Sequence, residues 1–238
     1  MIADLVKKAI RTSLPHPGST RRRPVSWGEL RRVDPISRQF GLDRGRPIDR
    51  YYIEQFLNNH RRQVRGRCLE VEDDTYIRQF GGNAVTGSDV LHIQAGNPHA
   101  TIVGNLESGQ NIPTGIFDCI ILTQTLQFIH DVRQAIQHAH NALRSGGTLL
   151  ATVSGISQIS RYDMDRWGEH WRFTDLAARR LFADVFGGGQ VQVRTYGNVL
   201  AAVAMLQGLS ADEITREELD HHDPDYQIIV AVCAQKPG

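Results

Sequence analysis

From Arg67 onward the sequence alternates short apolar runs with segments of helical spacing, and this alternation restricts the fold more than any other feature. The apolar runs predict strands at Arg67–Val71, Ala84–Asp89, Ala100–Val103, Phe117–Leu122, Thr148–Val153, Gln190–Thr195 and Gln227–Ala234. The clearest helices between them are Val132–Leu143 and Asp175–Phe186, which follow Asp131 and Thr174 as N-caps. Strands that alternate with helices form a parallel sheet covered on both faces, so we expect an α/β fold.

The N-terminal part differs in charge from the rest of the chain. Residues 1–50 carry twelve Lys and Arg against five Asp and Glu, whereas the remaining residues have a net charge of −6. Residues 2–14 have the spacing of a basic amphipathic helix, and residues 48–60 have the spacing of a second helix. We assign residues 1–46 to a basic extension and residues 47–238 to the α/β domain. Two roles stay open for the extension: contact with an anionic partner, or packing on the domain or on a second copy in a homodimer.

Several classes of protein are disfavoured by the composition. No apolar run approaches the ~20 residues of a membrane-spanning helix, and the first residues lack the layout of a secretory signal. Cys68, Cys119 and Cys233 each lie in an apolar run, as expected of buried reduced thiols, so we expect a cytoplasmic protein without an integral membrane segment. Because the basic residues are concentrated in the extension and lack interleaved aromatic residues, we expect no nucleic-acid partner.

Five short motifs occur in a consistent order along the alternating region. They are "LEVEDD", "VTGSDV", "IVGNLE", "FDCIILTQTLQFIHDV" and "LRSGGTLLATV". In this order they resemble the class I S-adenosylmethionine-dependent methyltransferases, over roughly residues 49–235. The resemblance implies a Rossmann-like, seven-stranded, mostly parallel sheet with helices on both faces and an antiparallel last strand. It also implies S-adenosyl-L-methionine as the cofactor.

The resemblance also implies which residues bind the cofactor. Asp89 takes the position of the ribose acid and Asn105 that of the adenine acid, and Glu72 stands where the family has glycine. A positive φ at Glu72 costs on the order of 1 kcal/mol, which does not exclude binding. Carboxylates in this turn also suit the cationic cofactor. The expected cofactor-binding residues are Glu70, Val71, Glu72, Asp73, Asp89, Val90, Asn105, Leu106, Thr123 and Gln124.

The acceptor is expected between the end of the fourth strand and a lid at about residues 155–175 and 197–225. His130 is the candidate base, since its pKa range suits proton transfer, although it can instead cap or pack beside the next helix. The expected substrate-binding residues are Tyr76, Trp167, His170, Trp171, Arg172 and Tyr196. His138 and His140 lie on different helical faces and "DHHDPD" is typical of a polar turn, so we expect no metal.

Three functions remain open from the sequence. The first is methylation of a small molecule, with a sugar, phenolic or natural-product hydroxyl as acceptor. The second is a degenerate methyltransferase fold that serves as a non-catalytic partner or scaffold, because Glu72 and Asn105 depart from the family pattern. The third is a protein that binds S-adenosylmethionine and performs other chemistry, such as a cyclisation.

Overall fold

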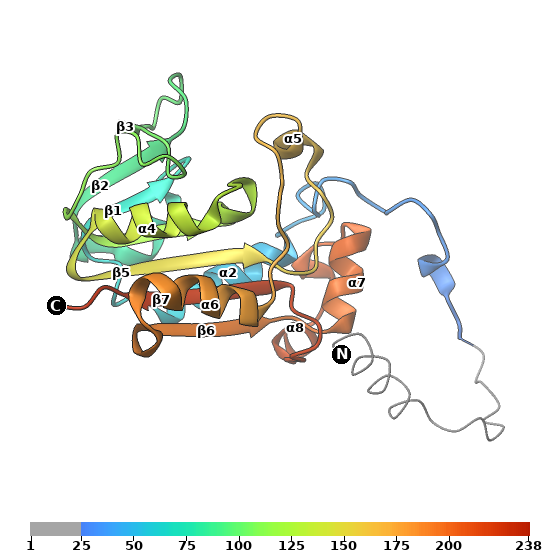
Figure 1. Cartoon of the computed structure of the whole chain (residues 1–238). Coiled ribbons are helices and arrows are strands. Elements are labelled where there is room, and N and C mark those ends of the chain that lie inside the picture. The colour runs from blue at the N-terminus through green and yellow to red at the C-terminus, as the bar shows by residue number, and fades with distance from the viewer. Residues whose placement is uncertain (1–24) are drawn as a thin grey trace, which may run out of the picture. The chain divides into compact units, whose positions relative to one another are not determined.

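A computed structural model describes residues 25–238, and these contain one sheet of seven strands (Figure 1). The strand order is β3-β2-β1-β4-β5-β7-β6, and only β7 runs antiparallel to its neighbours. The predicted seven-stranded, mostly parallel sheet is therefore confirmed. The strands are β1 (Gly66–Val71), β2 (Val85–His92), β3 (Ile102–Val103), β4 (Phe117–Thr123), β5 (Leu143–Ser154), β6 (Val191–Tyr196) and β7 (Ile229–Gln235).

The described residues fall into two units. The first, Met1–Asp34, contributes residues 25–34 with one short turn of 3-10 helix, η1 (Gly28–Leu30). The helix expected at residues 2–14 lies outside the described residues, and the role of the basic extension stays a prediction. The second unit, Pro35–Gly238, contains the sheet and includes residues 35–46, where Ile36 N donates to Gln207 O (2.9 Å) and Arg46 lies 2.5 Å from Glu54.

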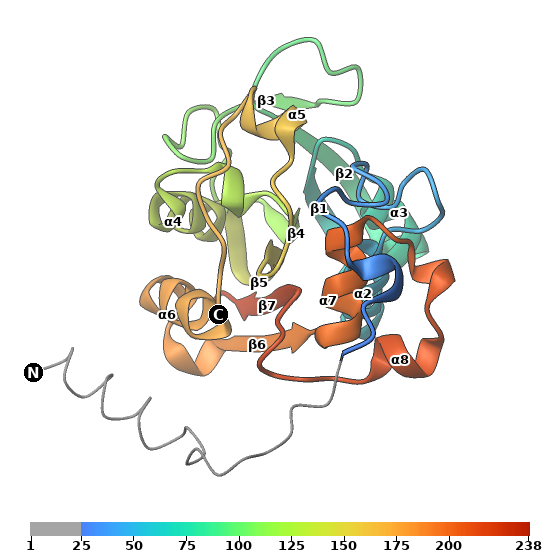
Figure 2. The ribbon, with the colours of Figure 1, turned by 90° about the vertical axis from the view of Figure 1, so that its right-hand side faces the viewer.

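Helices cover both faces of the sheet, as Figure 2 shows with α4 and α6 on one side and α2, α3 and α7 on the other. The helices are α2 (Ile48–Asn59), α3 (Thr75–Gly81), α4 (Val132–Ala142), α5 (Arg161–Met164), α6 (Asp175–Phe186), α7 (Val199–Gln207) and α8 (Arg216–Asp220). Four further 3-10 turns are η2 (Gly82–Ala84), η3 (Leu126–Phe128), η4 (Gly188–Gln190) and η5 (Ala211–Glu213).

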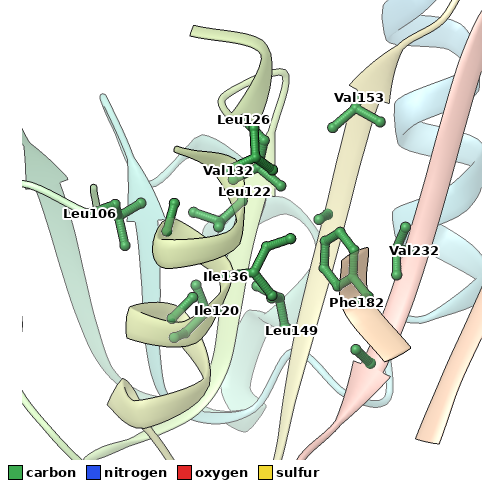
Figure 3. Close-up of a cluster of buried hydrophobic side chains, with 14 of the residues drawn as sticks. Leu106, Ile120, Leu122, Leu126, Val132, Ile136, Leu149, Val153, Phe182 and Val232 are labelled. Carbon is green, nitrogen blue, oxygen red and sulfur yellow. The ribbon is translucent and has the colours of Figure 1, made fainter. Parts of the chain in front are cut away.

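The apolar face of α4 explains how one side of the sheet is covered. Val132, Ala135, Ile136 and Ala139 recur at helical spacing and are all buried. Figure 3 shows Ile136 in the same cluster as Phe182 of α6 and several strand residues. A fully buried side chain of this size contributes about 1.5–3 kcal/mol. This cluster therefore holds β4 and β5 in a fixed position beneath the two helices.

Both predicted N-caps are confirmed. The Asp131 side chain accepts from Gln134 N (3.1 Å) at the start of α4, and the Thr174 side chain accepts from Ala177 N (3.2 Å) at the start of α6. A side-chain oxygen at this position satisfies a backbone N–H that has no partner within the helix. The caps fix where each helix begins, and hence the length of the connection that precedes it.

Most strand ends lie within one or two residues of the prediction, and two boundaries differ by more. β5 begins at Leu143 rather than at Thr148, with a register irregularity opposite Phe117. The predicted end of β2 at Asp89 is wrong, because the strand continues to His92. Asp89 is tolerated inside a strand because its carboxylate accepts from Arg67 Nε (2.7 Å) on β1 and from Thr101 Oγ1 (3.0 Å).

The three cysteines are all described and free. Cys68 and Cys119 are direct partners across β1 and β4 and are both 0% exposed, whereas Cys233 on β7 is half-buried. The expectation of buried thiols is thus confirmed for Cys68 and Cys119. No helix within residues 25–238 combines the length and the hydropathy needed to cross a membrane.

Candidate active site

A cavity of about 1170 Å³ lies at the carboxyl edge of the sheet. Its lining includes Val71, His92, Thr123 and Ser154, which are the last residues of β1, β2, β4 and β5. From β1 the chain continues to β2 and β3 on one side, whereas β4 and β5 lie on the other, so the cavity spans a point where the strand order reverses. Open α/β sheets bind their ligands at such points.

The turn after β1 has a left-handed backbone of the kind that glycine adopts most readily. Glu72 has a φ of 76°, and Glu72 N donates to Leu91 O (3.1 Å). The Asn97 amide donates to Glu72 O (2.7 Å), which holds the same peptide from the other side. The Glu72 side chain lines the cavity, 3.3 Å from His92 Nε2. Glutamate thus adopts a left-handed conformation here, and the turn keeps its close approach to the cavity.

Glu70 faces away from the cavity, toward α3. Its carboxylate is 3% exposed and accepts from Tyr76 N (3.3 Å) and Ile77 N (2.9 Å) in the first turn of that helix. Burial raises the pKa of Glu70 to about 8, although the two backbone hydrogen bonds favour the charged form. Glu70 therefore anchors α3 behind the turn rather than lining the cavity itself.

Three other residues expected at the cofactor lie outside the lining. Asp73 accepts from Thr75 N (2.8 Å) and shapes the turn before α3. Asp89 lies within β2, and its carboxylate is occupied by Arg67 and Thr101. Val90 is buried beside it. Because the strand continues past Asp89, the residues that reach the cavity from β2 are Leu91 and His92, followed by Ile93 and Gln94.

The structure does bring Val71, Glu72, Asn105, Leu106, Thr123 and Gln124 together around the cavity. The amide oxygen of Asn105, however, already accepts from Glu107 N (2.7 Å) and Ser108 N (3.3 Å). This oxygen shapes its own loop and is not free to accept from an adenine amino group. The adenine role that the resemblance implied for Asn105 is therefore corrected. Leu106, which is buried, supplies an apolar wall beside it.

Trp167 and His170, in the segment after β5, both line the cavity. The Trp167 ring meets the His92 ring edge-on, with centroids 6.2 Å apart. The segment therefore extends from the end of β5 to the end of β2. We call residues 155–174 the lid.

Trp171 and Arg172 fix the lid in place instead of lining the cavity. Trp171 Nε1 donates to Ile129 O (3.0 Å) and to His130 O (3.2 Å), and 42% of its surface is exposed. Arg172 forms an ion pair with the buried carboxylate of Glu169 (2.6 Å). The expectation that Trp171 closes over the acceptor is therefore corrected: its indole N–H attaches the lid to the connection between β4 and α4.

Tyr76 and Tyr196 are also buried away from the cavity. Tyr76 OH accepts from Arg50 (3.2 Å), and the Tyr196 ring packs 5.8 Å from the ring of Tyr52. Within the described chain the lining ends at His170, so residues 197–225 contribute nothing to it. Asn198, near the start of that segment, caps α7 by accepting from Ala201 N (3.0 Å).

His130 lies at the cavity, in the connection between β4 and α4. Its ring is exposed to solvent and lies 5.4 Å from the ring of His170 and 6.3 Å from that of Trp171. No hydrogen bond to its ring nitrogens is found within the described residues. The imidazole can therefore take up a proton from a bound group and pass it to water.

Sequence reasoning missed the contribution of the N-terminal side. Phe40, Leu42 and the first turn of α2, with Asp49 and Arg50, line the cavity. Arg50 places a guanidinium group there, held by the hydroxyl of Tyr76. A charged pair at a helix start is common on protein surfaces, so the only available signal was that this helix follows a proline directly before the alternating region.

Metal-binding residues do not gather in the part of the chain that the structure describes, where no group of three or more His, Cys, Asp or Glu could hold an ion. His138 Nδ1 lies 2.8 Å from Leu106 O, and His222 Nε2 lies 2.8 Å from Thr195 Oγ1. These contacts involve one histidine of the α4 pair and one of "DHHDPD".

Solved structures with the same fold include an S-adenosylmethionine-dependent methyltransferase from Mesorhizobium loti (TM-score 0.50, 15% identity, covering 82% of this chain and 100% of that one). They also include the N-methyltransferase NodS from Bradyrhizobium japonicum in complex with S-adenosyl-L-homocysteine (TM-score 0.50, 12% identity, covering 85% of this chain and 95% of that one). A third is the [4+2]-cyclase SpnF (TM-score 0.50, 15% identity, covering 79% of this chain and 80% of that one). A comparison with curated protein sequences gave no match.

A family model described as a methyltransferase domain matches residues 50–187, which is more than half of the chain. The match begins in α2 and ends just after α6, so it includes most of the residues around the cavity. It confirms the resemblance drawn from the motifs, and with it the expected cofactor, S-adenosylmethionine, at the level of the family. The chain belongs to the class I S-adenosylmethionine-dependent methyltransferases.

Proposed function

We propose that the protein is an S-adenosylmethionine-dependent methyltransferase that acts on a small molecule, with a hydroxyl oxygen as the preferred acceptor atom. One observation carries the proposal: a cavity of about 1170 Å³ lies at the ends of β1, β2, β4 and β5, and residues of the lid line it. This volume exceeds the ~300–1,000 Å³ of typical ligand pockets, which leaves room for an acceptor beside the cofactor.

The lining suits the charges of the cofactor. S-adenosylmethionine carries a sulfonium, an ammonium and a carboxylate group. Arg50 is the residue that would hold the carboxylate, and Asp49 and Glu72 would face the ammonium group. Val71 and Leu106 offer apolar surface to the adenosine part. The left-handed backbone at Glu72 supports this fit, because it gives the turn the shape that glycine gives in other family members.

The cofactor supplies an electrophilic methyl group. In the transfer, a lone pair of the acceptor oxygen would form the bond to the methyl carbon while the carbon–sulfur bond breaks, and the electron pair of that bond would stay on the sulfur. The residues of the protein position the acceptor and exclude water, which supplies most of the rate enhancement. We propose that His130 receives the hydroxyl proton, because its ring lines the cavity and reaches solvent.

The fold is compatible with the two other functions. SpnF shows that a protein of this fold can be a cyclase, and a degenerate scaffold would also keep the sheet. The intact cavity and the glycine-like turn favour a protein that binds a ligand over a scaffold.

The first experiment measures binding of S-adenosylhomocysteine by calorimetry, and then transfer of a labelled methyl group to a panel of hydroxyl compounds. His130→Ala should lower turnover by ~10²–10⁴-fold while the cofactor affinity holds. His221→Ala is the matched control, because His221 is exposed and lies outside the lining. Absence of binding at millimolar cofactor would favour the scaffold. Near-normal turnover of His130→Ala would leave positioning alone as the mechanism.

A further inference from the structure

A buried amide on the floor of the cavity has an oxygen without a partner. Gln127, in η3, lines the cavity and is 2% exposed. Its Nε2 donates to Gln124 Oε1 (2.8 Å), yet its Oε1 accepts no hydrogen bond within the described residues. Buried polar atoms are normally paired, so an unpaired acceptor on a residue that lines a cavity points to a ligand that supplies the donor.

A short chain of hydrogen bonds in the structure assigns which end of the amide is free. Gln124 Oε1 accepts from both Gln127 Nε2 (2.8 Å) and Ser154 Oγ (2.5 Å), and Gln124 Nε2 lies 3.4 Å from Thr152 Oγ1. In this arrangement Gln127 points its nitrogen at Gln124. Its oxygen is therefore the atom left for a ligand.

Gln127 lies on the side of the cavity expected to hold the acceptor. Its contacts join the end of β4 to the end of β5 through Ser154, and its backbone oxygen accepts from His170 N (2.8 Å) of the lid. The cofactor is expected over β1, β2 and β4, which leaves the space under the lid for the acceptor. A donor group bound to Gln127 would thus belong to the acceptor.

The charge of the lining narrows the acceptor further. Five carboxylates line the cavity against two guanidinium groups, and one of the five, that of Glu169, is ion-paired with Arg172 outside the lining. The carboxylates are those of Asp49, Glu72, Glu107, Asp163 and Glu169, and the guanidinium groups are those of Arg50 and Arg166. The Asp163 carboxylate has no ion pair or side-chain hydrogen bond within residues 25–238. A lining of this sign attracts cations and repels anions.

We propose that the methyl acceptor is an uncharged or cationic small molecule that bears hydroxyl or amine donors and no anionic group, and that one donor binds Gln127 Oε1. This proposal rests on the methyltransferase function proposed above. Gln127 is an acceptor-binding residue, whereas His130 takes the proton. Carboxylated and phosphorylated compounds are excluded by the carboxylates around the site, Asp163 among them.

The test uses matched sets of compounds that differ only in charge. Glucose, glucosamine, glucuronic acid and glucose 6-phosphate form one set, and tyrosol, tyramine and 4-hydroxyphenylacetate form another. Transfer of a labelled methyl group is measured for each. We expect transfer to the neutral and amine members alone. Gln127→Leu should raise KM for these at least tenfold while the Kd for S-adenosylhomocysteine stays within twofold.

Two further variants separate binding from folding. Gln134→Leu makes the same change on an exposed position of α4 and should leave KM unaltered. If Gln127→Leu is unstable, Gln127→Glu replaces it, because it keeps an acceptor oxygen. In Gln127→Glu the KM should return toward the wild-type value more fully for amine acceptors than for hydroxyl acceptors. Wild-type protein that fails to bind S-adenosylhomocysteine would refute the proposed function. Wild-type protein that binds it but prefers the anionic members, or methylates none, would overturn the inference, as would an unchanged KM in Gln127→Leu.

Discussion

Glu70 should make the stability of this protein fall as pH rises through neutrality. Its carboxyl group is 3% exposed, and burial raises its pKa from 4.5 to about 8. Between these two values the folded protein holds a proton that the unfolded chain has released. Its stabilising contribution is complete below about pH 4.5 and is lost as the pH rises through about 8.

The size of the effect follows from the proton count. One extra proton in the folded state changes the free energy of unfolding by about −1.4 kcal/mol per pH unit. Between pH 5.5 and pH 8 the loss from this group alone is about 3 kcal/mol. Other titrating groups contribute to the total slope, so the informative quantity is the difference between the wild type and Glu70→Gln.

The assay is urea unfolding of both proteins at pH 5.5, 6.5, 7.5 and 8.5. Glu70→Gln cannot titrate, and it keeps an oxygen that accepts one of the two backbone N–H groups of α3. The lost hydrogen bond shifts its curve by a constant amount but does not change its slope. Wild-type stability should therefore fall relative to the variant as pH rises. Parallel curves, or a wild type that gains stability relative to the variant, would refute the argument.

Three shorter predictions concern the cavity and its lid. Arg50→Ala should weaken S-adenosylhomocysteine binding by ~1.5–3 kcal/mol in calorimetry, because a charged hydrogen bond is lost. Tyr76→Phe removes only the hydroxyl that holds Arg50, so it should weaken this binding less. Asp89→Asn should leave the affinity for S-adenosylhomocysteine within twofold, since Asp89 is paired with Arg67 inside the sheet. A tenfold loss of affinity would instead indicate that Asp89 binds the ribose. Trp171→Phe removes the indole N–H that bonds to Ile129 O, so the free energy that holds the lid in place should fall by about 1 kcal/mol and proteolysis within residues 155–174 should become faster. An unchanged cleavage rate would contradict the anchoring role of Trp171.

The parts of the fold that depend on local pattern were predictable. Apolar alternation predicted the strands, and Asp131 and Thr174 marked two helix starts, because a cap acts on the residues directly after it. The end of β2 was not predictable in this way. Asp89 looked like a strand end because an unpaired acid is unfavourable in a sheet, and its partner Arg67 is visible only once β1 and β2 are paired.

The candidate site was predictable only where family motifs mark it. Glu72 and His130, which line the cavity, stand at fixed positions after strands in those motifs. Trp171 was misassigned because an indole that binds a ligand and one that binds the backbone look alike in sequence. Gln127 carried no signal, since its significance lies in an oxygen left without a partner after every neighbour is placed.

The thiols on the central strands give the protein an internal reporter of its own unfolding. Cys68 and Cys119 are neighbours in the sheet and both are fully buried, so a thiol reagent has no access to either. The contact with Cys68 together with burial also raises the pKa of Cys119, which disfavours its reactive thiolate. Cys233, half-buried on β7, has a pKa raised to about 11 but is closer to solvent. Labelling of Cys233 should therefore report local opening of β7, whereas labelling of Cys68 and Cys119 requires β1 and β4 to separate. The rates of labelling at these thiols therefore distinguish local opening at β7 from separation of the central strands.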